Sequence, residues 1–308
     1  MKLGFANPNL DIDTKVNILL SFYSVNQLFS ELKEQAFALA KILVEVHPND
    51  PKAHSIYGDL LSQDNKYAEA RDQFLKVIKL DSSKYVVWEE VMKLDIQLEK
   101  FDHLADVSKK AIELFPEQPV PFLFSGMASL QLKRYEEALT SFKRGLNLVV
   151  KNDELLAEFY MYLGDTYHSL KNTEASDKSY DKSLELKYDN PYVLNNYAYY
   201  LAVRNVNLNK AEVMSKKSIE MDSANSSFQD TYGWVLFRMG RFREAKTWVG
   251  KALEEKGGPS AEVLEHYGDI LYRLGETEKA VEYWEKAKAK GPGSEFLQKK
   301  IAEKKIYE

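Results

Sequence analysis

The sequence predicts an all-α fold of stacked helix pairs, on the evidence of three series of small residues. Five glycines recur at intervals of 68, 38, 69 and 35 residues, which are one or two periods of 34 with short insertions: Gly58, Gly126, Gly164, Gly233 and Gly268. A mostly small series lies nineteen residues further along: Val77, Ala111, Gly145, Ser183, Ser218, Ala252 and Ala287. A third series lies between them: Ala70, Leu104, Ala138, Ser176, Ala211, Ala245 and Ala280. Small residues at a fixed period mark points where helix backbones approach closely, so each period is one helix pair.

The residues around these glycines resemble the tetratricopeptide repeat. The segments that carry the resemblance are Tyr57-Gly58, Leu163-Gly164-Asp165-Thr166-Tyr167, Tyr232-Gly233-Trp234 and Tyr267-Gly268-Asp269. Each is followed about twelve residues later by a small residue, an aromatic residue and then Ala. The third copy departs from the pattern, with Met92 and Leu104 at the small positions, and so does the sixth, with Ala198. The resemblance covers residues 17–294 and implies a right-handed α-α superhelix, a solenoid of about eight helix pairs.

The run from Asp230 to Leu236 is also similar to repeat proteins of Bacteroidetes-type bacteria, which implies a bacterial source.

We expect residues 1–308 to form a single solenoid domain. The repeats are expected at 17–50 (degenerate), 51–84, 85–118, 119–152, 157–190, 191–225, 226–259 and 261–294, followed by a capping helix at 295–306. Asp11 or Asp13 can cap a first helix that runs to Tyr23, and its partner is expected at 30–46. Prolines such as Pro48 and Pro116 follow the second helix of a pair, where a helix breaker is expected.

The insertions that disturb the period are expected at turns. Four extra residues lie within 146–163, one lies within 205–209 and one lies at Gly257-Gly258-Pro259. An insertion inside a helix would rotate the face that packs, which is why we place them between helices. The aromatic residues at the large positions of the repeat are expected in the core: Phe74, Trp88, Phe122, Phe142, Tyr180 and Trp284.

Composition limits the classes of function. The net charge of −5 argues against nucleic acid as a partner, because a phosphate backbone requires a basic face. The terminal lysines Lys299, Lys300, Lys304 and Lys305 are interpreted as the solvated face of a last helix. No apolar run approaches the ~20 residues needed to cross a bilayer, so membrane insertion is not expected.

The compartment stays undetermined between cytoplasm and periplasm. The sequence contains no cysteine, which removes disulfides and zinc-thiolate sites but suits either compartment. Residues 1–30 lack the pattern of a signal peptide, and the chain can be a trimmed piece of a longer protein.

The sequence contains no motif that predicts catalysis. No two of the five histidines are three or four residues apart, so no metal site is expected. The glycine-rich joints lack the lysine of a phosphate-binding loop, and no G-x-S-x-G elbow occurs. We therefore expect a protein without enzymatic activity and without a cofactor.

A binding groove is predicted from one stripe of the repeat. Positions 2, 5, 9 and 12 of each first helix line the concave groove in the family that this chain resembles, and here they are rich in large side chains. Exposed aromatic residues in a concave surface are typical of partner anchors. The predicted partner-binding residues are Leu123, Met127, Met161, Tyr192, Asn195, Tyr199, Trp234, Phe237 and Tyr272. The alternative is that these side chains pack on one another or on a neighbouring helix.

The sequence therefore favours an interaction scaffold that binds a peptide segment of a partner protein. The carboxylate-clamp form of the family is rejected, because Asn195 and Asn196 lack accompanying basic residues in adjacent copies. Two alternatives are a self-assembly module that docks through its terminal repeats and the repeat array of a longer protein. The position of exposed apolar surface, groove or ends, distinguishes binding from self-assembly.

Overall fold

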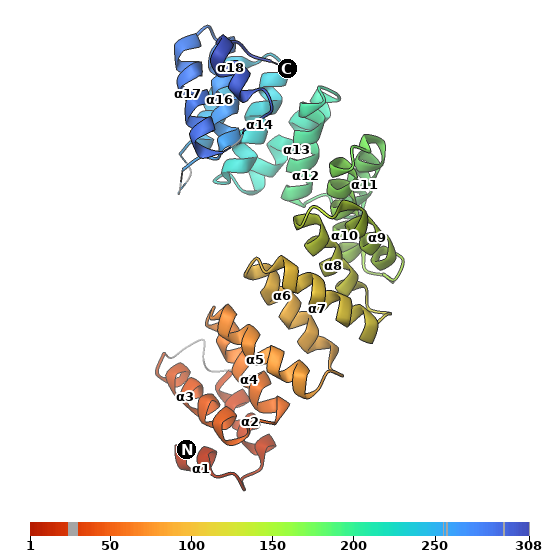
Figure 1. The fold of residues 1–308 in the computed structure, drawn as a ribbon, viewed down its shortest axis with the longest axis vertical. Helices are drawn as coiled ribbons and strands as arrows, with labels where there is room; N and C mark the ends of the chain where they lie inside the picture. The colour runs from red at the N-terminus through yellow and green to blue at the C-terminus, as the bar shows by residue number, and fades with distance from the viewer. Residues whose placement is uncertain (24–29, 255, 257, 292, 308) are drawn as a thin grey trace. The chain divides into compact units, whose positions relative to one another are not determined.

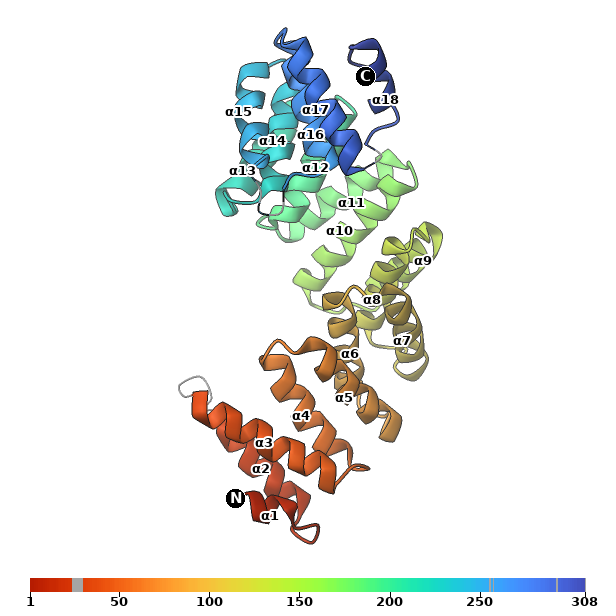
Figure 2. The same cartoon turned by 60° about the vertical axis from the view of Figure 1, so that its left-hand side comes forward.

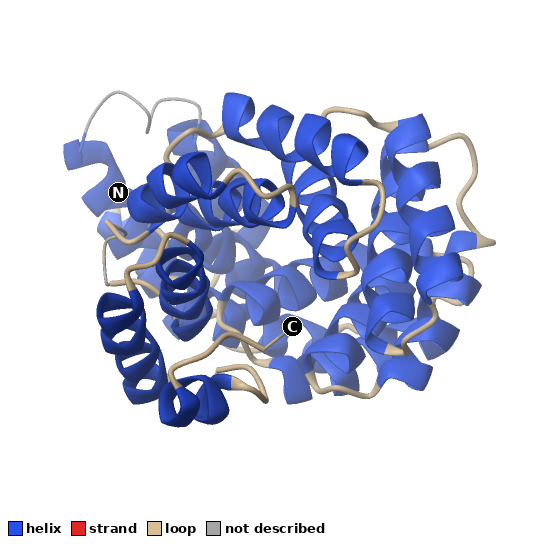
Figure 3. Ribbon diagram, turned by 90° about the horizontal axis from the view of Figure 1, so that it is seen from above, coloured by secondary structure: helices blue, strands red, loops and turns tan. Residues whose placement is uncertain are grey.

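The computed structural model describes residues 1–23, 30–254, 256, 258–291 and 293–307. Within these ranges the secondary structure is entirely helical, which confirms the all-α prediction (Figure 3). Residues 24–29, part of the repeat expected at 17–50, lie outside the described residues, as do residue 257 of the predicted joint and residue 292. Internal contacts divide the chain into two compact units, Met1–Ser176 and Asp177–Glu308.

The first unit contains ten complete helices, drawn from red to green in Figure 1. They are α1 (Lys2–Ala6), α2 (Ile12–Tyr23), α3 (Ser30–Val46), α4 (Pro51–Gln63), α5 (Tyr67–Leu80), α6 (Tyr85–Gln97), α7 (Phe101–Leu114), α8 (Pro119–Gln131), α9 (Tyr135–Leu146) and α10 (Asp153–Ser169). Helices that follow one another in sequence pack side by side, most extensively α4 with α5 and α8 with α9.

The second unit follows the same scheme (Figure 2). Helix α11 (Thr173–Leu186) spans the boundary between the units. The remaining helices are α12 (Pro191–Val203), α13 (Leu208–Met221), α14 (Ser226–Arg238), α15 (Phe242–Ala252), α16 (Ala261–Arg273), α17 (Thr277–Lys290) and α18 (Leu297–Glu303). The hairpins α12/α13, α14/α15 and α16/α17 stack through their first helices, since α12 contacts α14 and α14 contacts α16.

The turns inside seven repeats, from the one after α4 onward, share one hydrogen-bond geometry. After α4, Asn65 adopts a positive φ of 58°, and the amide of Lys66 donates to the carbonyl of Leu61 over 2.9 Å. This is the Schellman geometry, which satisfies carbonyls left free at a helix end. The residues with positive φ in the equivalent turns are Asn65, Glu99, Lys133, Lys171, Asn205, Gly240 and Gly275. Only two of the seven are glycine, so the spacing of small residues does not mark these turns.

Five of the first helices, α4, α10, α12, α14 and α16, begin at side-chain caps. Asp50 accepts a hydrogen bond from the amide of Lys52, and Asn190 accepts from the amides of Tyr192 and Val193. These caps satisfy amides that have no partner within the helix. Proline follows directly at positions 51, 119 and 191, where its missing amide costs nothing.

The four-residue insertion lies in a helix, which corrects the prediction that it falls in a turn. Helix α10 has 17 residues, whereas α8 and α12 have 13. A turn of α-helix contains 3.6 residues, so four added residues lengthen the helix by about one turn and almost preserve its packing face. The single extra residue near Asn205 does lie in a turn, between α12 and α13.

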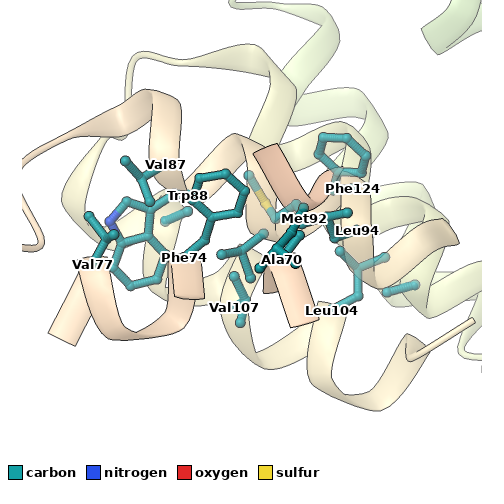
Figure 4. Close-up of a cluster of buried hydrophobic side chains, with 14 residues drawn as sticks. Ala70, Phe74, Val77, Val87, Trp88, Met92, Leu94, Leu104, Val107 and Phe124 are labelled. Carbon is teal, nitrogen blue, oxygen red and sulfur yellow. The ribbon is translucent and has the colours of Figure 1, made fainter. Parts of the chain in front are cut away.

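The small residues allow side chains of the second helix to contact the backbone of the first. A Cβ added at Gly268 would lie 2.5 Å from the indole of Trp284, and one added at Gly58 would lie 3.0 Å from the ring of Phe74. Figure 4 shows Phe74 in its buried cluster, beside Ala70 and Trp88. The six aromatic residues expected in the core are all buried, which confirms that prediction.

We predict that Gly268→Ala destabilises the protein although alanine is the better helix former. The new methyl group collides with Trp284, an overpacking that costs about 1–3 kcal/mol, against a gain in helix propensity of about 1 kcal/mol. The matched control is Gly250→Ala in α15, where the added Cβ lies an ordinary 3.7 Å from Tyr267. Urea unfolding followed by circular dichroism should show a lower midpoint for the first variant and an equal or higher midpoint for the control. Equal midpoints for the two variants would contradict the close-approach argument.

Candidate functional site

The candidate site is a pair of adjoining hollows in the second unit. The larger hollow has a volume of about 640 Å³ and the smaller one about 270 Å³. Both hollows are lined by Tyr199 of α12, by Glu262 of α16 and by Ser260, the N-cap residue of α16. The larger hollow continues to Trp234 and to the C-terminal segment, and the smaller one continues along α12 and α14.

The structure brings three of the nine predicted binding residues to these hollows. Asn195 lines the smaller hollow, Trp234 lines the larger one, and Tyr199 lines both. Tyr192 is 60% exposed on α12 and packs edge-on against Phe228. The half-buried Tyr272 lies beside Trp284 at a ring distance of 6.0 Å.

Three of the nine predicted residues are buried rather than exposed. Leu123 joins a cluster around Phe142 and Phe159, and Phe237 packs behind Trp234. Asn195 is 8% exposed. The expectation of open surface at these three positions is therefore corrected, because a first helix packs its inner side against its neighbours.

The two remaining residues, Met127 and Met161, lie in the first unit and are half-buried. Met127 packs against apolar clusters of that unit. Binding by any of the nine predicted residues remains a prediction.

Aromatic stacking fixes the centre of the site. The indole of Trp234 is stacked on the imidazole of His266 at 4.0 Å and on the ring of Phe237 at 4.7 Å. His266 in turn meets Asp230, whose carboxylate oxygens lie 3.0 and 3.1 Å from Nδ1. Burial by itself lowers the pKa of His266, but the adjacent Asp230 carboxylate outweighs it and the pKa is raised.

A hydroxyl and a carboxylate link α12 to α16 at the rim. The hydroxyl of Tyr199 donates a hydrogen bond to Glu262. Burial raises the pKa of Tyr199, and the negative charge of Glu262 raises it further, so the phenol keeps its proton. Glu262 is exposed, accepts this hydrogen bond and makes no ion pair among the described residues.

Two polar atoms of predicted site residues lack a partner. Oδ1 of Asn195 and Nε1 of Trp234 are buried and make no hydrogen bond within the described part of the chain. The amide nitrogen of Asn195 donates to Asn196, which orients the group and leaves its oxygen as the unpaired atom. Such a group costs about 1–3 kcal/mol, so a ligand that supplies a partner gains free energy there.

The C-terminal segment closes one end of the larger hollow. Nζ of Lys300 donates to Glu265 over 2.8 Å and to Asp269 over 2.7 and 2.9 Å, and all three side chains are buried. This corrects the interpretation of Lys300 as a solvated lysine, whereas Lys299, Lys304 and Lys305 are exposed. The long stem and single ammonium of lysine allow it to reach both carboxylates from α18.

The two carboxyl groups respond differently to this contact. Burial by itself raises the pKa of Glu265, but hydrogen bonds from Lys300 and Ser294 outweigh it and lower the pKa. Burial raises the pKa of Asp269 and prevails over the opposing effect of Lys300. The ammonium therefore holds α18 on α16 by neutralising buried acidic groups.

The sequence reading missed the acidic members of the site. Asp230, Glu262, Glu265 and Asp269 occupy positions 2, 5 and 9 of the last two first helices, the same stripe that gave the aromatic prediction. A count of charge along that stripe would have found them. The contact with Lys300 had no sequence signal, because it depends on how the last segment folds back.

Other hollows lie away from this stripe. One of about 440 Å³ lies between α4 and α5 in the first unit, beside Tyr57. Another of about 550 Å³ lies between α11 and α13 in the second unit, beside Tyr188 and Val213. Within the described residues, no group of three or more His, Cys, Asp and Glu side chains is placed to hold a metal ion. None of the described helices combines the length and apolar character that a bilayer span requires.

These features place the chain in the class of all-helical repeat proteins, and acidic and aromatic side chains line the hollows on its first helices α12, α14 and α16. The tetratricopeptide repeat family matches residues 31–84 and 233–295, and a second model of the same repeat matches residues 157–190. The chain therefore contains tetratricopeptide repeats. No curated protein matches the sequence.

Solved structures support the fold. The tetratricopeptide repeat protein YrrB, described as having an unusual peptide-binding site, has a TM-score of 0.52 at 20% identity, over 61% of this chain and 92% of its own. A tetratricopeptide repeat protein from Parabacteroides merdae has a TM-score of 0.62 at 16% identity, over 82% of this chain and 98% of its own. The APC/C hetero-tetramer Cut9-Hcn1 has a TM-score of 0.68 at 12% identity, over 94% of this chain and 54% of the other. At these identities the likeness concerns the fold alone.

We predict that Lys300→Met releases α18 from α16. The substitution keeps most of the stem but leaves two buried carboxylates without their cation, and breaking such a group costs about 3–5 kcal/mol. Hydrogen exchange measured by mass spectrometry should accelerate across residues 293–307. The triple variant Lys300→Met, Glu265→Gln, Asp269→Asn should recover protection, because no unpaired charge remains. Fast exchange in the triple variant as well would show that packing, not charge, holds the segment.

Asp59, which lies at position 9 of a first helix in the first unit, makes the stability of the protein depend on pH. Burial raises the pKa of Asp59 to about 6, with a further contribution from Glu90. The folded pKa lies above the unfolded value, so the folded state loses stability as pH rises from about 4 through 6. We predict that Asp59→Asn stabilises the protein by about 1–3 kcal/mol at pH 7.5 and gives no gain below pH 4. Urea unfolding at both pH values tests this, with Asp72→Asn, whose side chain is 69% exposed, as the control. The same gain at both pH values would refute it.

Proposed function

We propose that this chain is a non-enzymatic protein-interaction scaffold and that α12, α14 and α16 bind a peptide segment of a partner protein. The observation that carries the proposal is the continuity of the two hollows across these three first helices, through the shared residues Tyr199, Ser260 and Glu262. Neighbouring helices lie about 8–10 Å apart, so three helices span roughly 20 Å. That length matches about six residues of extended chain.

The chemistry of the walls suits a peptide. Tyr199, Trp234 and Phe296 offer large apolar surface at the larger hollow, and aromatic side chains contribute much of the binding energy at many interfaces. Unpaired polar atoms on Asn195 and Trp234 can be satisfied by the hydrogen-bonding groups of a polypeptide. The similarity to YrrB, a repeat protein with a peptide-binding site, supports the same class of function.

Self-assembly through the terminal repeats has less support. Large exposed apolar side chains are spread over both units, from Leu3 near the N-terminus through Val86 and Val150 to Val213. Single exposed apolar residues of this kind are normal on protein surfaces. Among the residues whose burial the structure describes, they do not gather at the ends, whereas self-assembly through the terminal repeats would require exposed apolar surface there.

We predict that Ser227→Trp abolishes peptide binding without unfolding the protein. Ser227 is exposed and lines the smaller hollow, so an indole at this position fills the hollow and removes no packing contact. A displayed library of random nonapeptides is selected on the wild-type chain, and the selected peptides are then measured on the variant by fluorescence anisotropy. We expect at least a tenfold loss of affinity, equivalent to about 1.4 kcal/mol.

The matched control is Ser223→Trp, which places the same side chain at an exposed position outside the hollows. Circular dichroism should show equal helix content in both variants. A library that yields no binder, or binders that are insensitive to Ser227→Trp, would overturn the proposed function.

A further inference from the structure

We propose that the smaller hollow is a subsite for a lysine or arginine side chain of the bound peptide. This inference rests on the proposed function and names the chemistry of the segment that the site takes. The smaller hollow has a volume of about 270 Å³, which lies below the ~300–1,000 Å³ typical of small-molecule pockets. The hollow therefore suits one side chain rather than a whole ligand.

The charge of the lining is one-sided. Asp230 and Glu262 contribute carboxylates, and the described lining contains no Lys, Arg or His. His266 pairs with Asp230 from the side of the larger hollow and is only a more distant positive neighbour of Glu262, which makes no ion pair among the described residues. A positive charge entering the smaller hollow therefore meets an uncompensated carboxylate at the rim and a second carboxylate in the wall.

A separate observation concerns hydrogen bonding. Asn195 is about nine-tenths buried, lines this hollow, and has an amide oxygen without a donor. An ammonium or guanidinium group carries donors and no acceptor, so it complements a wall that presents unpaired acceptors. The oxygen is shielded, so the proposed subsite requires the amide to turn toward the entering cation, which replaces the weak 3.3 Å contact with Asn196 by a charge-assisted hydrogen bond.

The aromatic residues of the wall complete the subsite. Tyr199 and Tyr200 line the same hollow, and their rings lie 5.9 Å apart. The methylene stem of lysine or arginine packs on such rings while the charged end reaches the carboxylates. The protein already uses this chemistry in the larger hollow, where the ammonium of Lys300 binds Glu265 and Asp269, residues of the same stripe.

The test compares four fluorescein-labelled nonapeptides built from glycine and serine with three copies of one residue. That residue is lysine, arginine, norleucine or glutamate, so the norleucine peptide keeps the stem and lacks the charge. Fluorescence anisotropy with the full chain should give affinities for the lysine or arginine peptide at least about tenfold higher than for the other two. Raising the salt concentration from 50 to 300 mM should weaken the binding.

The decisive variant is Glu262→Gln, which removes the charge and keeps an acceptor for the hydroxyl of Tyr199. We expect it to lower the affinity for the basic peptides about tenfold. The control Glu285→Gln changes the net charge equally at an exposed position of α17 outside the hollows, and its effect should stay below twofold.

The outcomes separate this inference from the proposed function. Equal affinity for the norleucine peptide, or an equal loss in the two glutamine variants, would overturn the cation subsite. If the selected library peptides are uncharged and still sensitive to Ser227→Trp, the subsite is wrong and the proposed function stands. If neither the library nor the basic peptides bind, both fail.

Discussion

The close approach of paired helices is the constraint on which the structure depends. At Gly58 and Gly268 an aromatic ring of the second helix occupies the space that a Cβ would need. A helix pair packed in this way can bury such a ring only because a small residue faces it. The same contact recurs at Gly126 against Phe142, although the third repeat has Met92 at this position, and it sets the register of the two helices. The same register determines which stripe of each first helix is left facing its neighbours in the stack.

The site follows from that stripe. In the second unit, the stripe carries Asp230, Glu262, Glu265 and Asp269 and no basic residue. Acidic groups brought together by stacked helices repel one another, and the protein compensates each differently. His266 faces Asp230, Lys300 neutralises Glu265 and Asp269, and Glu262 is left at the rim with a phenol. The proposed cation subsite thus exists because Glu262, unlike the other three acidic residues, has no ion-pair partner among the described residues.

The C-terminal segment has two roles in this arrangement. Leu297 is buried against the cluster of Trp284 and Leu271, so α18 covers apolar surface of the last repeat. Lys300, from the same helix, contributes charge to the larger hollow. The stability of the end of the second unit and the charge of the larger hollow are therefore linked through one short helix. A terminal helix that only covered apolar surface would need no buried lysine.

The sequence by itself determined the helix pairs, the aromatic core and the stripe of first-helix residues that lines the two hollows of the second unit, because each depends on local spacing repeated many times. It did not determine that Leu123 and Phe237 are buried, that the four-residue insertion extends α10, or that Lys300 reaches α16. Those features depend on how closely neighbouring helices pack and where the last segment returns. Only the tertiary structure decides such distances, since residues separated by more than 30 positions in the sequence meet there.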